Sequence, residues 1–194
     1  MNNRKFKCIQ GCSDCCINRE YYPSERFGKI GVLLLPSEVQ SIEEQARKRG
    51  MKVRILPRIA VGKNSPKKII AYQMMGKNDD GDLCPFLDIE SGNLSPHGGF
   101  ACGIYESRPI ACRAYPLFES GDDVKLDGHC KFCREFKTST ASADSLQGEI
   151  EALTMIKQEM EIADDSIRVW RYATATGRAE DTDRMLPEGW VMDG

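Results

Sequence analysis

Apolar residues along this chain fall into short runs and helical stripes. Residues 30–35 form an almost continuous apolar run that a proline ends, and this pattern predicts a buried strand. Residues 37–49 carry apolar positions at helical spacing, and Ser37 and Gln40 form a capping box at their start. This segment therefore predicts a helix, which we expect to stop at Gly50.

The middle of the chain predicts strands and then loops. Residues 53–59 place Val53, Ile55 and Pro57 opposite Arg54, Leu56 and Arg58, and residues 68–75 are rich in β-forming residues, so both segments predict strands. Asn, Asp and Gly residues predict turns at 78–81 and 121–123. Residues 83–118 are dense in proline, glycine and cysteine, which is typical of a region dominated by loops.

The C-terminal part of the chain predicts helices. Residues 137–144 are rich in Ser, Thr and Ala and indicate a linker. Apolar residues then recur at spacings of four, three, three and four over residues 146–160, which predicts a helix. We expect a second helix over residues 166–177 with Trp170 pointing inward. The pattern as a whole predicts a mixture of strands, helices and loops, with a helical C-terminal part.

Composition and charge are those of an ordinary globular chain. The 194 residues suffice for one domain with an appendage, with 41% hydrophobic and 29% charged residues. The net charge of −2 favours neither nucleic acid nor an anionic membrane as a partner. No apolar run approaches the roughly 20 residues of a membrane span, and the N-terminus lacks the apolar segment of a signal peptide. We therefore expect a cytoplasmic protein without membrane insertion.

Cysteine is the unusual component, because the chain contains nine. Disulfides need an oxidising compartment, and an odd number of cysteines leaves one thiol unpaired. Packing would explain scattered cysteines but not four within nine residues. Metal or cluster ligation explains that density, since several thiolates must converge on one centre. The four clustered cysteines are Cys8, Cys12, Cys15 and Cys16.

The spacing of the cysteines is typical of metal ligands. Cys12 and Cys15 have the C-x2-C spacing, as do Cys130 and Cys133. The side chains of the adjacent Cys15 and Cys16 should diverge, so they serve two centres or one of them supports a ligand. Eight thiolates make two four-ligand sites, and we expect Cys133 to be the spare thiol.

Spacing alone leaves zinc and iron–sulfur open. The chain has only two histidines, which disfavours a mixed Cys/His zinc site. We expect His97 to lie in a solvated loop, whereas His129 is a candidate ligand or hydrogen-bond donor beside Cys130.

One spacing matches an enzyme class that the rest of the chain argues against. Cys8-x3-Cys12-x2-Cys15 has the cluster spacing of radical S-adenosylmethionine enzymes. However, the chain is short for their barrel, Asp14 replaces the usual aromatic residue, and Cys16 is additional. No β/α repeat follows.

A longer series of residues resembles a known family. It comprises Cys8, Cys12-x2-Cys15-Cys16, then Cys84-Pro85-Phe86-Leu87, and then the stretch from Cys102-Gly103-Ile104-Tyr105 through Arg108-Pro109 to Cys112-Arg113-Ala114-Tyr115-Pro116. This series resembles the YkgJ-type cysteine-cluster family of zinc- or iron-chelating domains.

The resemblance implies a small cysteine-rich α+β domain over residues 1–137, with a loop-dominated metal centre or centres, and leaves 138–194 as the helical extension. A related cysteine arrangement occurs in the flagellin lysine methylase, which is associated with an iron–sulfur cluster. Two features depart from the family: the three-residue spacer after Cys8 and the long segment 89–100. By position, the implied metal ligands are Cys8, Cys12, Cys15, Cys16, Cys84, Cys102, Cys112 and Cys130.

Residues beside the cysteines have expected roles as well. The guanidinium groups of Arg108 and Arg113 could offset the negative charge of a thiolate centre, so we take them as candidate cofactor-binding residues. The alternative is a surface arginine paired with an acidic neighbour. We expect Tyr105, Tyr115 and Phe118 to lie in the core.

Charge patterning indicates a candidate docking surface. Residues 47–68 contain nine basic residues and no acidic one, which favours an acidic protein partner or a larger complex. The C-terminal helices offer a second surface for a partner. No aromatic residues alternate with the basic ones as a stacking platform would require, so we do not expect nucleic acid.

These observations predict a cysteine-ligated metalloprotein rather than an enzyme. Thiolates exceed the needs of one zinc ion and histidine is scarce, so an iron–sulfur cluster of the 4Fe–4S type is the predicted cofactor, with zinc or mononuclear iron as alternatives. The expected role is that of a redox- or oxygen-responsive protein, or of an accessory subunit. The alternatives are an iron–sulfur-dependent protein-modifying enzyme and a zinc-stabilised interaction module. The chain has no nucleotide loop, zincin motif or nucleophile elbow.

Overall fold

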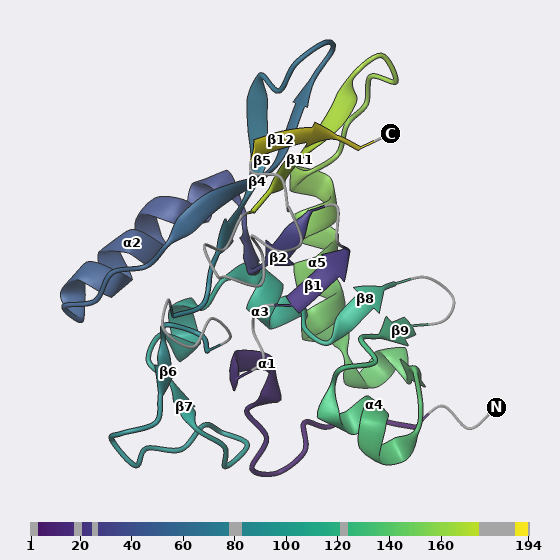
Figure 1. Ribbon diagram of the computed structural model, residues 1–194. Coiled ribbons are helices and arrows are strands. Elements are labelled where there is room, and N and C mark those ends of the chain that lie inside the picture. The colour runs from purple at the N-terminus through teal and green to yellow at the C-terminus, as the bar shows by residue number, and fades with distance from the viewer. Residues whose placement is uncertain are drawn as a thin grey trace. The chain divides into compact units, whose positions relative to one another are not determined.

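The computed structural model describes residues 4–17, 21–24, 27–77, 83–120, 124–174 and 189–193. The chain forms two compact units, and each combines two separate stretches of sequence. The first unit comprises Met1–Asn18 and Phe86–Gln158, and the second comprises Arg19–Pro85 and Glu159–Gly194. These units do not test the predicted division after residue 137, which stays a prediction. Figure 1 labels most of the helices and strands of both units.

A five-stranded antiparallel sheet forms the second unit (Figure 1). Its order is β12-β11-β4-β5-β3, with bounds β3 Val32–Leu34, β4 Ile55–Gly62, β5 Lys68–Met74, β11 Arg168–Ala173 and β12 Gly189–Met192. The short strands β1 (Tyr21–Ser24) and β2 (Gly28–Ile30) pair separately. The predicted strands at 30–35, 53–59 and 68–75 are confirmed, with small shifts in their bounds.

Helix α2 (Val39–Lys48) follows β3, as predicted, but its capping differs from the prediction. A 3-10 turn, η1 (Pro36–Glu38), precedes it, and the N–H of Leu35 donates to Glu38 Oε2 at 2.9 Å. The predicted capping box of Ser37 and Gln40 is therefore wrong, because Gln40 donates along the helix to Glu44 instead. Gly50 ends the helix with a φ of +65°, as expected.

Gln73 is a fully buried polar residue at the centre of the sheet. Its Oε1 accepts from the N–H of Gly31 at 3.1 Å, and its Nε2 donates to the carbonyl of Pro57 at 3.2 Å. The pairing of β4 with β5 shifts register after Pro57. The amide of Gln73 thus satisfies backbone groups of two other segments, which makes its burial tolerable.

The predicted helix over residues 166–177 is wrong. Residues 168–173 form β11, which pairs with β4 through Arg168 and Gly62 and with β12 through Trp170 and Met192. Trp170 is half-buried, and its indole N–H donates to the carbonyl of Gly62 at 3.4 Å. Hydrogen bonding to a strand on each edge overrides the local preference for helix. Residues 175–177 of the predicted helix lie outside the described residues.

The first unit combines short helices with small sheets. Its strands pair as β10-β9-β8 and β6-β7. The bounds are α1 Asp14–Ile17, β6 Leu87–Asp88, β7 Ala101–Cys102, η2 Tyr105–Ser107, α3 Ile110–Ala114, β8 Leu117–Glu119, β9 Val124–Leu126, α4 Lys131–Phe136, β10 Thr140–Ala141, η3 Ala143–Ser145 and α5 Gln147–Glu159. The mixture of helix and sheet agrees with the predicted α+β class. The predicted turns at 78–81 and 121–123 lie outside the described residues.

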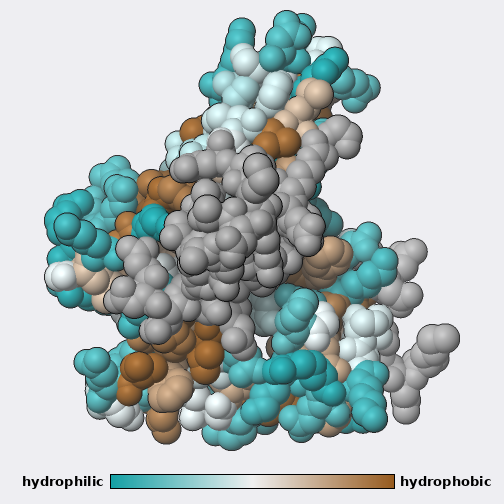
Figure 2. Space-filling view, viewed as in Figure 1, coloured by the Kyte–Doolittle hydropathy of each residue, from teal (hydrophilic) through white to brown (hydrophobic). Residues whose placement is uncertain are grey.

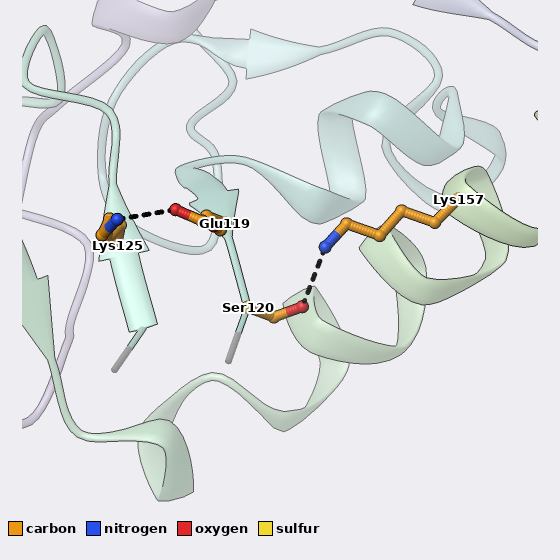
Figure 3. Close-up of polar contacts among 4 residues, drawn as sticks. All are labelled: Glu119, Ser120, Lys125 and Lys157. Atoms are coloured by element: carbon orange, nitrogen blue, oxygen red, sulfur yellow. Dashed lines mark hydrogen bonds and ion pairs between the residues drawn. The ribbon is translucent and has the colours of Figure 1, made fainter. Parts of the chain in front are cut away.

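Helix α5 packs within the first unit, and it agrees with the helix predicted at 146–160. Its apolar residues Ile150 and Leu153 contact the core cluster around Phe132 and Leu146. Figure 3 shows Lys157 reaching from α5 toward the end of β8, where its Nζ lies 3.5 Å from Ser120 Oγ. The predicted linker at 137–144 instead contains β10 and most of η3, so this segment is structured.

The helices give one further observation. None of those in the described part of the chain combines the length and the apolar content that a membrane crossing requires.

Candidate metal centre

The N-terminal cysteines lie on a tight turn that runs into one turn of helix. The N–H of Cys12 donates to the carbonyl of Ile9 at 3.0 Å, and Gly11 has a φ of +73°, a conformation that favours glycine. Helix α1 follows and carries Cys15 and Cys16. The loop thus folds back on itself between the first and the third cysteine of the series.

The sulfurs of Cys15 and Cys16 lie 4.0 Å apart. The prediction that these adjacent side chains diverge is therefore wrong. Two thiolates on one tetrahedral zinc are about 3.8 Å apart, given the usual Zn–S length of about 2.3 Å. The observed separation is close to that value, so adjacency does not prevent the pair from sharing a centre.

Helix α4 brings a second pair of cysteines into the first unit. Cys130 is the N-cap residue of α4, where its N–H donates to the carbonyl of Asp127 at 2.9 Å, and Cys133 is buried in the helix. Arg134 of α4 forms an ion pair with Asp14 of α1. This contact joins the helix that begins after Cys130 to the helix that carries Cys15.

Four thiols from these two segments lie in one another's electrostatic field. Burial and the neighbouring sulfurs of Cys12, Cys15 and Cys130 raise the pKa of Cys8 from 9.0 to about 11. Burial also raises the pKa values of Cys12 and Cys130, and Cys15 adds to both shifts. Every pair among the four interacts in this way. We call Cys8, Cys12, Cys15 and Cys130 the four-thiol cluster.

Cys133 contacts the cluster through Cys130. Burial, Cys130 and Asp127 raise the pKa of Cys133 to about 11, and its side chain is hydrogen-bonded to that of Cys130. The side chain is thereby placed to support the sulfur of Cys130. This arrangement is compatible with the prediction that Cys133 is the spare thiol, which stays a prediction.

The donor set of the cluster fits zinc or iron, because both ions accept four sulfur ligands. The raised pKa values mean that the metal-free thiols are protonated near neutral pH, so binding must release protons. Within the described ranges, no three His, Cys, Asp or Glu side chains already stand in coordinating geometry. Ligation therefore requires the cysteine side chains to turn toward a common centre.

Comparison with known proteins assigns the chain to a family. A family model named CxxCxxCC, described as "Putative zinc- or iron-chelating domain", matches residues 7–134, which include all nine cysteines. The chain belongs to this family. No curated protein and no solved structure matches the chain.

Cys84, Cys102 and Cys112 of the CxxCxxCC domain lie in separate segments of the fold. Cys102 ends β7, where it pairs with Leu87 of β6, and Cys112 lies in α3. Both are half-buried in the first unit, whereas Cys84 is buried in the second. Their predicted role as ligands, like that of Cys16, stays a prediction.

The aromatic and basic positions of the motif have mixed outcomes. The guanidinium of Arg108 stacks on the ring of Tyr105 at 4.1 Å, and Arg113 is exposed on α3. Their role beside a thiolate centre stays a prediction. Tyr105 and Tyr115 are half-buried. Phe118 is 76% exposed, so its predicted place in the core is wrong.

Neither histidine belongs to the four-thiol cluster. The ring of His129 is exposed and its Nδ1 lies 3.0 Å from Asp127 Oδ1, so it contacts a carboxylate beside Cys130. His97 is half-buried, and its carbonyl accepts from the N–H of Gly11 at 2.7 Å. The loop around His97 is thus packed against the cysteine turn rather than fully solvated as predicted.

Sequence reasoning missed the residues that hold this loop on the cysteine turn. The N–H of Phe100 donates to Ser13 Oγ at 2.7 Å, and Ser13 is buried. A Cβ added to Gly99 would lie 2.4 Å from the carbonyl oxygen of Cys12 and 2.4 Å from Ser13 Oγ. The adjacent glycines of the loop were the available signal, because close backbone approach is a common reason for glycine.

Proposed function

We propose that this chain holds an iron–sulfur cluster, or zinc, on the four-thiol cluster, and that it serves as a redox-responsive protein or accessory subunit. The observation that carries this proposal is that Cys8, Cys12 and Cys15 lie in the electrostatic field of the sequence-distant Cys130, while Phe6 and Asp14 fasten their segment to α4. An all-sulfur set without histidine is the ligand set of iron–sulfur clusters and of four-cysteine zinc sites. A 4Fe–4S cluster uses all four thiolates, and redox activity would follow from its iron.

The cellular setting of the proposal follows from the thiols. All nine cysteines are thiols rather than halves of disulfides. Thiols in this number persist in a reducing compartment, which supports the cytoplasm as the location. An exposed cluster would also make the protein oxygen-sensitive, because thiolates released from a damaged cluster are oxidised in turn.

Two surfaces support a protein partner. The basic segment 47–68 exposes seven of its basic side chains, at the end of α2 and around the β4–β5 turn: Arg47, Lys48, Arg49, Lys52, Lys63, Lys67 and Lys68. Figure 2 shows hydrophobic residues gathered over the β6–β7 hairpin, where Ile89, Leu94 and Phe100 are exposed. Binding through the basic segment should weaken steeply with salt, whereas binding through the hairpin should not.

Metal analysis tests the proposal. Protein purified without oxygen should be brown and contain iron and acid-labile sulfide, or be colourless and contain zinc. Cys130→Ala should lose this metal, whereas Ser139→Ala, at an exposed position of the same unit, should keep it. A stable wild-type protein that binds neither iron nor zinc, or a Cys130→Ala variant with full metal content, would overturn the proposal.

A further inference from the structure

The N-terminal arm, residues 4–9, is anchored to a turn that follows the family domain in the sequence. The N–H of Phe6 donates to Ser145 Oγ at 2.8 Å, and the N–H of Ser142 donates to the carbonyl of Arg4 at 2.9 Å. The hydroxyl of Ser145 in turn donates to the carbonyl of Ser142 at 2.7 Å. The turn therefore holds the arm at two residues, Arg4 and Phe6.

Aromatic packing fastens the same arm to the helix that follows Cys130. The ring of Phe6 meets the ring of Phe132 edge-on with centroids 5.0 Å apart, and Phe132 is fully buried in α4. The guanidinium of Arg4 lies 4.2 Å from the ring centroid of Phe136, at the end of α4. The arm thus contacts both the turn and α4.

Cys8 follows Phe6 by two residues, so the anchor limits where its sulfur can lie. Two residues of extended chain span about 7 Å at most. The other side of Cys8 leads to the cysteine turn and Cys12. Fixing Phe6 against Ser145 therefore confines Cys8 near Cys130, where the two thiols interact.

We propose that the turn of Ser142 and Ser145 is a positioning element of the metal centre, because it holds the arm that brings Cys8 to Cys12, Cys15 and Cys130. The family match ends at residue 134, so this element lies outside it. The inference rests on the proposed function. It adds that tight metal binding needs the turn of Ser142 and Ser145 as well as the cysteines. A ligand that is held in place before the metal arrives binds more tightly than one on a loose arm.

The matched variants are Ser145→Ala, which removes the acceptor of the Phe6 bond, and Ser139→Ala, which removes an exposed hydroxyl from the same segment. Ser145→Thr keeps a hydroxyl at the anchor. Zinc affinity, measured by competition with a chromogenic chelator, should fall about fivefold in Ser145→Ala, the effect of one lost hydrogen bond. It should be unchanged in Ser139→Ala and restored in Ser145→Thr.

Alkylation of the metal-free protein at fixed pH provides a second measurement. Mass spectrometry should show Cys8 reacting faster in Ser145→Ala than in the wild type, with buried Cys84 of the other unit as the internal reference. If Ser145→Ala does not fold, Arg4→Ala loosens the arm through Phe136 instead and should give the same two changes.

The outcomes separate this inference from the proposed function. If the wild type binds no zinc or iron, the proposed function fails, and the alkylation rates still decide whether the turn positions Cys8. If the wild type binds metal and Ser145→Ala matches it in affinity and in Cys8 reactivity, the inference is overturned while the proposed function stands.

Discussion

Arg134 of α4 and Asp14 of α1 form an ion pair that connects the two segments carrying the four-thiol cluster. Cys130 precedes Arg134 by one helical turn, and Cys15 follows Asp14 directly. The ion pair therefore helps to hold the segment of Cys15 close to Cys130, the fourth member of the four-thiol cluster.

Breaking this ion pair should weaken metal binding more than it weakens folding. Asp14→Asn keeps the shape of the side chain and removes its charge. Because the arginine is largely exposed, the pair is worth about 1 kcal/mol at most, which corresponds to a loss of roughly fivefold in zinc affinity. Competition titration measures the change, with Asp144→Asn, an exposed aspartate in η3, as the control. Equal affinities for Asp14→Asn and the wild type would contradict the prediction.

The metal-free protein should lose stability at alkaline pH. The folded pKa values of Cys8 and Cys133 are raised from 9.0 to about 11, so above pH 9 the unfolded chain releases protons that the folded chain retains. This contribution is fully present below pH 9 and is lost as the pH rises to about 11. Urea unfolding at several pH values measures it, and Cys133→Ala should show a shallower decline. A flat profile over this range would be incompatible with the buried, clustered thiols.

Gly99→Ala should disturb the cysteine turn. The added Cβ would lie 2.4 Å from the carbonyl oxygen of Cys12, a backbone atom that cannot move aside without shifting the turn. We expect destabilisation of about 1–3 kcal/mol, as for overpacking elsewhere, together with lower zinc affinity. Gly148→Ala is the control, because nothing lies within 4 Å of its added Cβ and alanine favours the helix α5. Thermal melting and zinc competition measure the two effects. A Gly99→Ala variant with the melting temperature and zinc affinity of the wild type would contradict the prediction.

Gln73→Met should destabilise the second unit. The substitution keeps the approximate size of the side chain but leaves the N–H of Gly31 and the carbonyl of Pro57 without the partners that Gln73 provides. Each unsatisfied buried group costs about 1–3 kcal/mol, so the free energy of unfolding should fall by roughly 2 kcal/mol or more. Denaturant unfolding measures the loss, and Gln40→Met on the exposed face of α2 should change it little. Two equally stable variants would contradict this account.

Local patterns were sufficient for several elements. The apolar run ended by proline predicted β3, and the helical stripe that stops at Gly50 predicted α2. The regular apolar spacing over residues 146–160 predicted α5. In these segments the chain's own periodicity agrees with the burial that the fold imposes, and such agreement makes an element predictable.

Other elements depended on distant partners. Residues 168–173 form a strand because β4 and β12 supply pairing edges from elsewhere in the sequence. Phe118 stays exposed although its neighbour Leu117 is buried in the core, because strand β8 turns alternate side chains to opposite faces. Neither the pairing of residues 168–173 nor the face on which Phe118 lies can be inferred from the residues of the segment itself.

The nine cysteines, their C-x2-C spacings and the family motif were enough to indicate a zinc- or iron-chelating domain before any tertiary contact was known. Packing between distant segments set which thiols lie near one another. Phe6 docks on α4 and on Ser145, and Arg134 pairs with Asp14, so the segments that carry Cys8 and Cys15 are held against the helix that begins after Cys130. A metal site requires side chains to converge within a few ångströms, and only packing between segments far apart in the chain can impose that convergence.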